Sequence, residues 1–202
     1  RERSCPGHGN RAGDLRVSVD HGQFPRFDAG GLRLLAVQGW RRTAGLRGAD
    51  ERGGRHPPAQ PEHCPHWRLA CSLPVVKTNA KGFGTYVAAD YDELADSPVE
   101  MADFWSGDFA AKGVPHRVVV TGASASFDGA RLLKDMQRIC ETQITFWHGK
   151  GKPDHDRYVF LINAVDEGYG GLEHKHCTAL ICQRQDLPHI HQPRASDGYV
   201  GL

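Results

Sequence analysis

The sequence predicts an α+β fold, on the basis of three observations in its C-terminal two thirds. A β-branched run, HRVVVTGA at 116–123, is typical of a buried strand. A segment with the apolar spacing of a helix follows it, and RYVFLINAV at 157–165 predicts another buried strand. Strands and a helix in this order, with a further strand after them, indicate an α+β layer that contains at least one hairpin-like pair of strands.

The other strands are predicted from alternating apolar residues. WRLACSL at 67–73 alternates its apolar side chains onto one face, and GFGTYVAA at 82–89 is a second strand. LEHKHCTALIC at 172–182 alternates in the same way and is predicted as a single strand after the turn DEGYGG. In the first third of the chain, strands are predicted within 14–20 and 31–38.

One long helix is predicted after residue 128. Asp128 is a suitable N-cap, since its carboxylate can accept a hydrogen bond from the first helical turn. Leu132, Met136 and Ile139 form one apolar stripe. The neighbouring apolar positions are Leu133, Cys140 and Ile144. By contrast, YDELADSPVEM at 91–101 is too short, and too interrupted by proline, for a long helix.

Residues 1–66 differ in composition from the rest of the chain. They contain eleven Arg and no Lys with a net charge of +4 (11 minus 7), whereas residues 67–202 carry −3 (14 minus 17). Three explanations are open: a basic arm for nucleic acid, a poorly ordered extension rich in Gly and Pro, or translation of GC-rich DNA in a shifted frame. Acidic residues interrupt the arginines and no nucleic-acid-binding motif occurs, so the sequence favours the last two and predicts no nucleic-acid partner.

The bulk properties predict a cytoplasmic globular protein. The 202 residues have a net charge of +1 and are 39% hydrophobic, so the chain is not disordered by composition. It has no apolar run of about 20 residues, the length that a membrane span needs. The segment RERSCPGHGN also lacks the apolar core of a signal peptide. We therefore predict a cytoplasmic location, no membrane partner and six free cysteines, and the sequence leaves the oligomeric state open.

Paired histidines are the candidate metal ligands. His174 and His176 would point to one face of the predicted strand, and a second H-x-H pair lies at 189–191. Close pairs are nevertheless expected by chance among twelve histidines, and the zinc motif H-E-x-x-H is missing from the sequence. We therefore expect no metal in this chain. Cys177 and Cys182 are expected to be small core residues, although each could in principle be a nucleophile.

Several segments together resemble the glycyl aminopeptidase family. They are YDELADSPVEM, GVPH, RLLKDMQRIC and YVFLINAVDEGYGGLEHKHCTALICQRQDLP. Members of that family are cytoplasmic zinc peptidases with an N-terminal β domain, a thermolysin-like catalytic domain and a PDZ domain. The resemblance covers about residues 67–199. It implies that 67–90 are the end of the N-terminal β domain and 91–202 the β-rich N-terminal lobe of the catalytic domain, preceded by an atypical segment at 1–66.

The resemblance also implies a substrate site in GYGGLEH. Gly170 and Gly171 would line the path of a bound peptide, because strand glycines let another backbone approach closely. Glu173 would pair with the α-ammonium group of a peptide that has a free N-terminus. His174 would be a wall residue beside them. The peptide is therefore the expected partner.

Zinc is the cofactor of the intact family, but we expect the chain to end before the zinc-binding helix. No catalytic residue and no metal ligand is therefore assigned, and the chain alone is expected to be inactive as a peptidase. Two alternatives are open. The first is a non-catalytic module that binds peptide by β-augmentation. The second is a small His-rich metal-binding protein.

Overall fold

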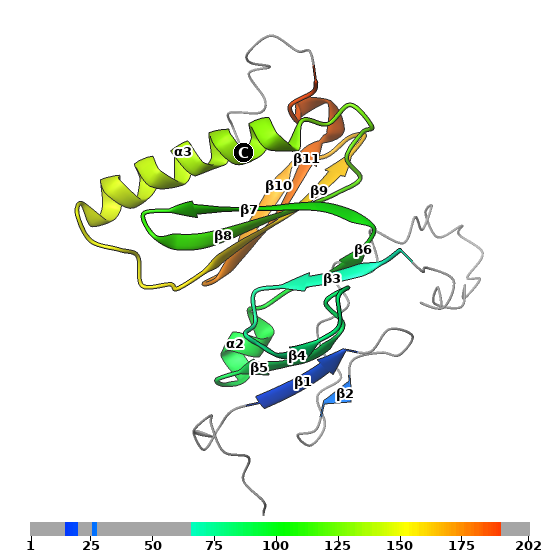
Figure 1. The fold of residues 1–202 in the computed structure, drawn as a ribbon, viewed down its shortest axis with the longest axis vertical. Helices are drawn as coiled ribbons and strands as arrows, with labels where there is room; N and C mark the ends of the chain where they lie inside the picture. Colours follow the sequence, from blue (N-terminus) through cyan, green and yellow to red (C-terminus); the bar gives the residue numbers. More distant parts are fainter. Residues whose placement is uncertain (1–14, 20–25, 28–65, 191–202) are drawn as a thin grey trace, which may run out of the picture.

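The computed structural model describes residues 15–19, 26–27 and 66–190, the first two ranges by their backbone alone. Figure 1 shows, from top to bottom, helix α3, a large sheet, a pair of strands and a smaller sheet. The elements are β1 (Leu15–Val19), β2 (Arg26–Phe27), β3 (Arg68–Cys71), β4 (Val75–Thr78), β5 (Gly84–Ala88), α2 (Tyr91–Ala95), β6 (Val99–Ala102), β7 (Phe104–Ala111), β8 (Val114–Thr121), α3 (Gly129–His148), β9 (Tyr158–Val165), β10 (Gly170–Glu173) and β11 (Cys177–Gln183), followed by a 3-10 turn at Arg184–Asp186.

The large sheet has five strands in the order β10-β11-β9-β8-β7. β7 and β8 form an antiparallel hairpin, whereas β8, β9 and β11 run parallel to one another. The parallel pairing of β8 with β9 requires a crossover, and α3 provides it. The α+β prediction is therefore confirmed at the level of the fold class, as are the buried strands predicted at 116–123 and 157–165.

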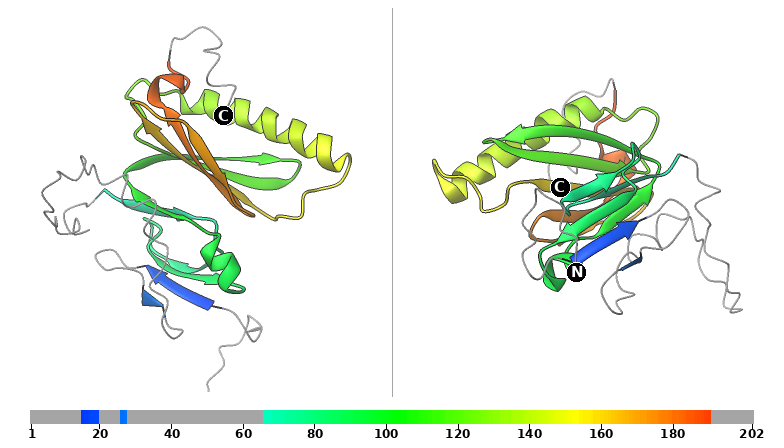
Figure 2. Two further views of the ribbon diagram at one scale, coloured as in Figure 1. Left: turned by 180° about the vertical axis from the view of Figure 1, so that it is seen from behind. Right: turned by 60° about the horizontal axis from the view of Figure 1, so that its bottom comes forward.

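Helix α3 packs its apolar side on this sheet (Figure 2). Asp128 is the N-cap as predicted, and its Oδ1 accepts a hydrogen bond of 3.0 Å from the Arg131 amide. Leu132 is 1% exposed and Ile144 is also buried, but Ile139, predicted on the same stripe, is 45% exposed. The buried residues follow an i+4 row, which is inclined to the helix axis, so Ile139 falls at the margin of the buried face.

The prediction of one strand at 172–182 is wrong. The chain forms an antiparallel hairpin there, with β10 and β11 on either side of a turn at 174–176. The His174 amide donates a 2.9 Å hydrogen bond to the Cys177 carbonyl, which closes the turn. The turn contains no glycine, proline or asparagine, the residues that usually mark one, so the alternating pattern concealed it. His174 and His176 therefore do not share the face of a strand.

The smaller sheet has the order β2-β1-β5-β4, and β3 pairs with β6 between the two sheets. Leu69 and Leu73 pack into a core with buried residues of β5. Ala70 instead joins residues of β8, β9 and β11 in a separate core. β3 is therefore buried on both faces and connects the two sheets. The strands predicted at 14–20, 67–73 and 82–89 are confirmed, and the one at 31–38 lies outside the described residues.

Strand β7 was not predicted from the sequence. Its residues, FWSGDFAA, contain a polar interruption with one glycine, SGD, which weakens both strand propensity and alternation. Pairing with β8 along the whole strand supplies the order that the local sequence does not. Neither helix in the described part of the chain combines the length and the hydrophobicity needed to cross a membrane.

A pH dependence of stability is expected from His116 on β8. Its ring is buried and stacks on Phe109 with centroids 4.9 Å apart, and its Nδ1 is 2.9 Å from the Val114 carbonyl. Burial lowers the pKa of His116 from its usual 6.5, despite that hydrogen bond. His155 and Tyr158 face the same ring at 6.3 and 6.2 Å. Burial and the neighbouring histidines lower the pKa of His155 as well.

The folded state therefore binds fewer protons than the unfolded chain below pH 6.5. The free energy of unfolding is expected to be fully developed above that pH and to fall as the pH drops from it toward the folded pKa. Urea unfolding between pH 7.5 and 5 measures the slope, with His116→Phe as the variant that removes this proton. An unchanged slope in that variant would show that His116 is not the cause.

Candidate functional site

Strand β10 forms one end of the large sheet. It pairs with β11 in the register Gly170↔Ile181, Gly171↔Leu180, Leu172↔Ala179 and Glu173↔Thr178. Among the described residues no strand pairs with its other side. An edge of this kind offers a row of backbone donors and acceptors to an added strand. The three β10 residues that the sequence analysis singled out, Gly170, Gly171 and Glu173, thus lie on an open edge.

The two glycines of β10 differ in what surrounds them. A Cβ atom on Gly170 would meet no heavy atom of the described chain within 4 Å, whereas one on Gly171 would lie 3.0 Å from Leu180 Cδ2. Packing against β11 thus explains the glycine at 171. No contact within the described part of the chain explains Gly170, so the space over it is available to another molecule.

Glu173 is exposed and belongs to the same face of the strand as Gly171. Its Oε1 lies 3.5 Å from the position of a Cβ on Gly171, so the carboxylate extends back along the strand. Leu172, on the other face, is 55% exposed and Tyr169 is 78% exposed. The edge therefore presents a carboxylate on one face and an apolar side chain on the other, which is suited to an extended peptide with a positive end.

His174 holds the hairpin turn instead of lining the strand. Its Nδ1 lies 2.7 Å from Asp96 Oδ1, and the Lys175 amide donates a 2.8 Å hydrogen bond to Asp96 Oδ2. Asp96 is partly desolvated, which opposes ionisation, but these hydrogen bonds outweigh that effect and keep its pKa below the ordinary value. The ionised Asp96 therefore fixes the turn, and with it the end of β10 that carries Glu173.

Asp96 was not identified from the sequence as a site residue. It is the C-cap of α2 and lies 78 positions before His174. Nothing in the local pattern links residues so far apart. The only available signal is the acidic character of the segment 91–101, which is equally typical of an exposed helix.

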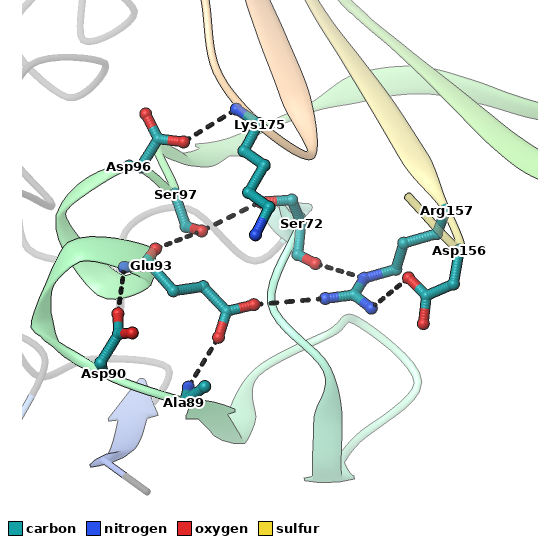
Figure 3. A network of polar contacts seen from close by, with 9 residues as sticks. All are labelled: Ser72, Ala89, Asp90, Glu93, Asp96, Ser97, Asp156, Arg157 and Lys175. Atoms are coloured by element: carbon teal, nitrogen blue, oxygen red, sulfur yellow. Dashed lines mark hydrogen bonds and ion pairs between the residues drawn. The ribbon is translucent and has the colours of Figure 1, made fainter. Parts of the chain in front are cut away.

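A polar network joins the same helix to the beginning of β9. Figure 3 shows Arg157 between Ser72 and Glu93: its Nε donates a 2.6 Å hydrogen bond to the Ser72 carbonyl, and its Nη2 lies 3.8 Å from Glu93 Oε1. Ser97 Oγ donates to the Glu93 carbonyl at 2.7 Å. Lys175 and Asp96 meet beside this network in the same figure. Ser72, Glu93 and Asp96 thus hold both the 174–176 turn and the start of β9 in place.

The described residues do not fit a zinc site. His174 Nε2 and His176 Nδ1 are buried without a hydrogen-bond partner in the described part of the chain. Nevertheless, residues 66–190 contain no group of three or more His, Cys, Asp or Glu side chains placed to hold a metal ion. The Nδ1 atom of His189 instead lies 3.0 Å from Ser126 Oγ, within hydrogen-bond distance. His191 lies outside the described residues. We assign no metal-dependent step to these residues.

The thiols of β11 are core residues, as the sequence predicted. Cys177 and Cys182 are both buried. Burial raises the pKa of each thiol to about 11. A thiol is a weak nucleophile until it ionises, so neither cysteine is activated in this fold.

The chain is similar to one family model and to two solved structures. Residues 56–103 match the family described as Peptidase M61 N-terminal domain. The chain is similar to the crystal structure of an aminopeptidase N family protein from Idiomarina loihiensis, with 35% identity and a TM-score of 0.63 over 71% of this chain and 23% of that one. Legionella pneumophila aminopeptidase A in complex with aspartic acid is a more distant match, with 12% identity and a TM-score of 0.40 over 65% of this chain and 16% of that one.

The first two of these matches support a peptidase M61-like family. The α+β fold corresponds to an N-terminal region of an aminopeptidase-like protein. No curated protein matches the chain. The chain spans only 23% of the length of the Idiomarina loihiensis protein.

Proposed function

We propose that the chain is part of a zinc-dependent, glycyl aminopeptidase-like peptidase and that it contributes the substrate wall of its cleft. The observation that carries the proposal is the open edge of β10, with unfilled space over Gly170 and an exposed carboxylate at Glu173. On this proposal, residues 67–90 complete an N-terminal β domain and 91–202 begin the catalytic domain. The match of residues 56–103 to the Peptidase M61 N-terminal domain supports an N-terminal β domain in this part of the chain, but it extends this domain past residue 90 to residue 103.

The peptide would bind as an added strand along β10. The free backbone groups of the edge would pair with the substrate main chain, as in other cases of β-augmentation. β10 spans four residues, so it can align only a short peptide segment. The missing side chain at Gly170 leaves room for the approaching backbone.

Glu173 would select for a free N-terminus. A primary ammonium group carries a positive charge and three donors, and an acetylated one carries neither that charge nor more than one donor. The ammonium would therefore make a charge-assisted hydrogen bond to the Glu173 carboxylate. Because Glu173 is exposed in this chain, water weakens the interaction, and binding is expected to be weak but selective.

Titration of the chain with short Gly- and Ala-initiated peptides tests this assignment. We expect the free peptide to bind, and either acetylation or Glu173→Gln to weaken binding about three- to tenfold, the range of one solvent-exposed charge-assisted contact. Gly170→Val should weaken binding by occupying the space over residue 170, where no described atom lies within 4 Å of the added Cβ. The matched control is Glu167→Gln, at an exposed acidic residue just before β10.

Equal affinity for free and acetylated peptides would overturn the role of Glu173, and full binding by Gly170→Val would overturn the position on β10. Hydrolysis provides a separate check. The purified chain is expected to release no N-terminal Gly or Ala in the presence of zinc, because the described residues do not hold that metal. Metal-dependent release above the uncatalysed rate would contradict this expectation.

A further inference from the structure

One carboxylate binds the two residues that follow Glu173. The Nδ1 atom of His174 lies 2.7 Å from Asp96 Oδ1, and the Lys175 amide donates a 2.8 Å hydrogen bond to Asp96 Oδ2. Asp96 is ionised at neutral pH, because its pKa lies below the ordinary value. An ionised carboxylate can only accept, so His174 Nδ1 is the donor. Each oxygen of Asp96 thus holds a different residue of the 174–176 turn.

Asp96 is itself held in place at the end of α2. Its amide donates to the Asp92 carbonyl at 2.9 Å. Ser97, the next residue, donates to the Glu93 carbonyl at 2.7 Å and accepts a 3.1 Å hydrogen bond from Ser72. Figure 3 shows Ser97 inside this network and Asp96 beside Lys175. The carboxylate therefore extends from a fixed point of the backbone.

The direction of the Glu173 side chain depends on the backbone that carries it. No ion pair between described residues includes Glu173. On one side β11 holds the strand: Glu173 pairs with Thr178, whose hydroxyl donates to the Leu172 carbonyl at 3.3 Å. On the other side Asp96 holds the turn. β11 and Asp96 together therefore set where the Glu173 carboxylate lies.

Loss of Asp96 would release the turn but not the strand. The side chain of His174 is only 12% exposed, and its Nε2 is buried without a partner in the described part of the chain. Without Asp96 its Nδ1 would be unpaired as well, and an unpaired buried donor is costly. The ring would therefore move toward water and displace the backbone next to Glu173. The pairing of β10 with β11 does not involve Asp96 and would remain.

We propose that Asp96 is a positioning residue for the recognition of a free N-terminus: through His174 and Lys175 it holds Glu173 within reach of the ammonium group of a bound peptide. This inference rests on the proposed function of β10. A charge-assisted hydrogen bond weakens steeply when its geometry is lost. Pairing of the peptide backbone with β10, by contrast, needs only the edge of the sheet. Asp96 should therefore control the preference for a free over an acetylated N-terminus, and not the affinity of the edge for peptide as such.

Titration of the full chain with a Gly-initiated peptide, in its free and acetylated forms, measures this preference. The wild-type chain is expected to prefer the free form about three- to tenfold. Asp96→Ala should reduce the preference to less than about twofold, and should change the affinity for the acetylated form by less than about twofold. Asp96→Asn keeps one acceptor oxygen, which can bind the Lys175 amide, so it should retain part of the preference.

A double-mutant cycle with Glu173→Gln shows whether Asp96 acts through Glu173. In the Glu173→Gln background the preference is already lost, so Asp96→Ala should have no further effect on it. A further loss there would mean that Asp96 attracts the ammonium group directly, which would overturn its role as a positioning residue. An equal loss of affinity for both forms of the peptide would overturn it too, since Asp96 would then only maintain the edge.

The matched control is Asp108→Ala, which removes an exposed carboxylate that pairs with Arg117 at 2.8 Å. Asp108 lies on β7, the terminal strand opposite β10 in the large sheet, so the preference should not change. A loss in this control as large as that in Asp96→Ala would contradict the inference.

The two proposals fail in different ways. If the wild-type chain shows no preference, the role of Glu173 fails and the role of Asp96 fails with it. If the wild-type chain prefers the free form and Asp96→Ala keeps that preference, only the inference about Asp96 fails. If Asp96→Ala does not fold, as judged by circular dichroism, Asp96→Asn decides the question, and an undiminished preference in that variant would overturn the inference.

Discussion

Leu132→Ala is expected to destabilise the chain by about 2–5 kcal/mol, the range for removing a fully buried leucine side chain. Leu132 is 1% exposed and contacts a core formed by β8, β9 and β11. Truncation would leave a cavity between α3 and the sheet, which a helix anchored at its N-cap by Asp128 cannot readily close. Since small domains are stable by about 5–15 kcal/mol, a loss of this size should be evident in urea or thermal unfolding.

Ile139→Ala is the matched control on the same helix. The sequence pattern places Ile139 on the stripe of Leu132, but the structure leaves it 45% exposed. We therefore expect the control to cost less than about 1 kcal/mol, as is usual for surface positions. Equal losses at the two positions would contradict the packing of α3, because they would require both side chains to be buried.

Gly129→Ala is the second large effect, and two opposing contributions decide its sign. Alanine is more favourable than glycine in a helix interior by about 1 kcal/mol, and the gain is smaller at 129, the first residue of α3. However, a Cβ at 129 would lie 2.2 Å from Trp105 Cζ2, far inside van der Waals contact. The indole cannot move away easily, because Phe127 meets it edge-on at 5.1 Å and Gly107 lies close beneath it. Overpacking of this kind costs about 1–3 kcal/mol, so we expect a net loss of stability.

A double-mutant cycle separates the two contributions. In a Trp105→Leu background the clash at position 129 is relieved, and Gly129→Ala should then be neutral or stabilising. Unfolding free energies of the four proteins give the coupling energy directly. If Gly129→Ala destabilises both backgrounds equally, the indole is not the obstacle and some other constraint on the backbone at 129 is responsible.

Local patterns were sufficient for most of the secondary structure. β8 and β9 are recognisable because buried strands in a covered sheet need continuous runs of apolar, β-branched residues. Asp128 and the apolar side of α3 are recognisable because capping and helical periodicity act over a few residues. β7 was missed because its pairing with β8, not its own composition, makes it a strand.

The site was only partly predictable. Gly170, Gly171 and Glu173 were identified through the resemblance of their segment to a known family, and the structure places all three on β10. The hairpin that brings β10 to the edge was hidden, because Asp96 holds its turn from a distant part of the chain.

The sequence by itself therefore determined the fold class, the N-cap of α3 and most of its buried side, because each depends on residues close together in the chain. Only the tertiary structure decided that 172–182 is a hairpin, that β10 is an open edge and that Ile139 is exposed. The physical reason is the same in each case. Edges, turns held by remote carboxylates and the margin of a packed face depend on partners that the local pattern does not contain.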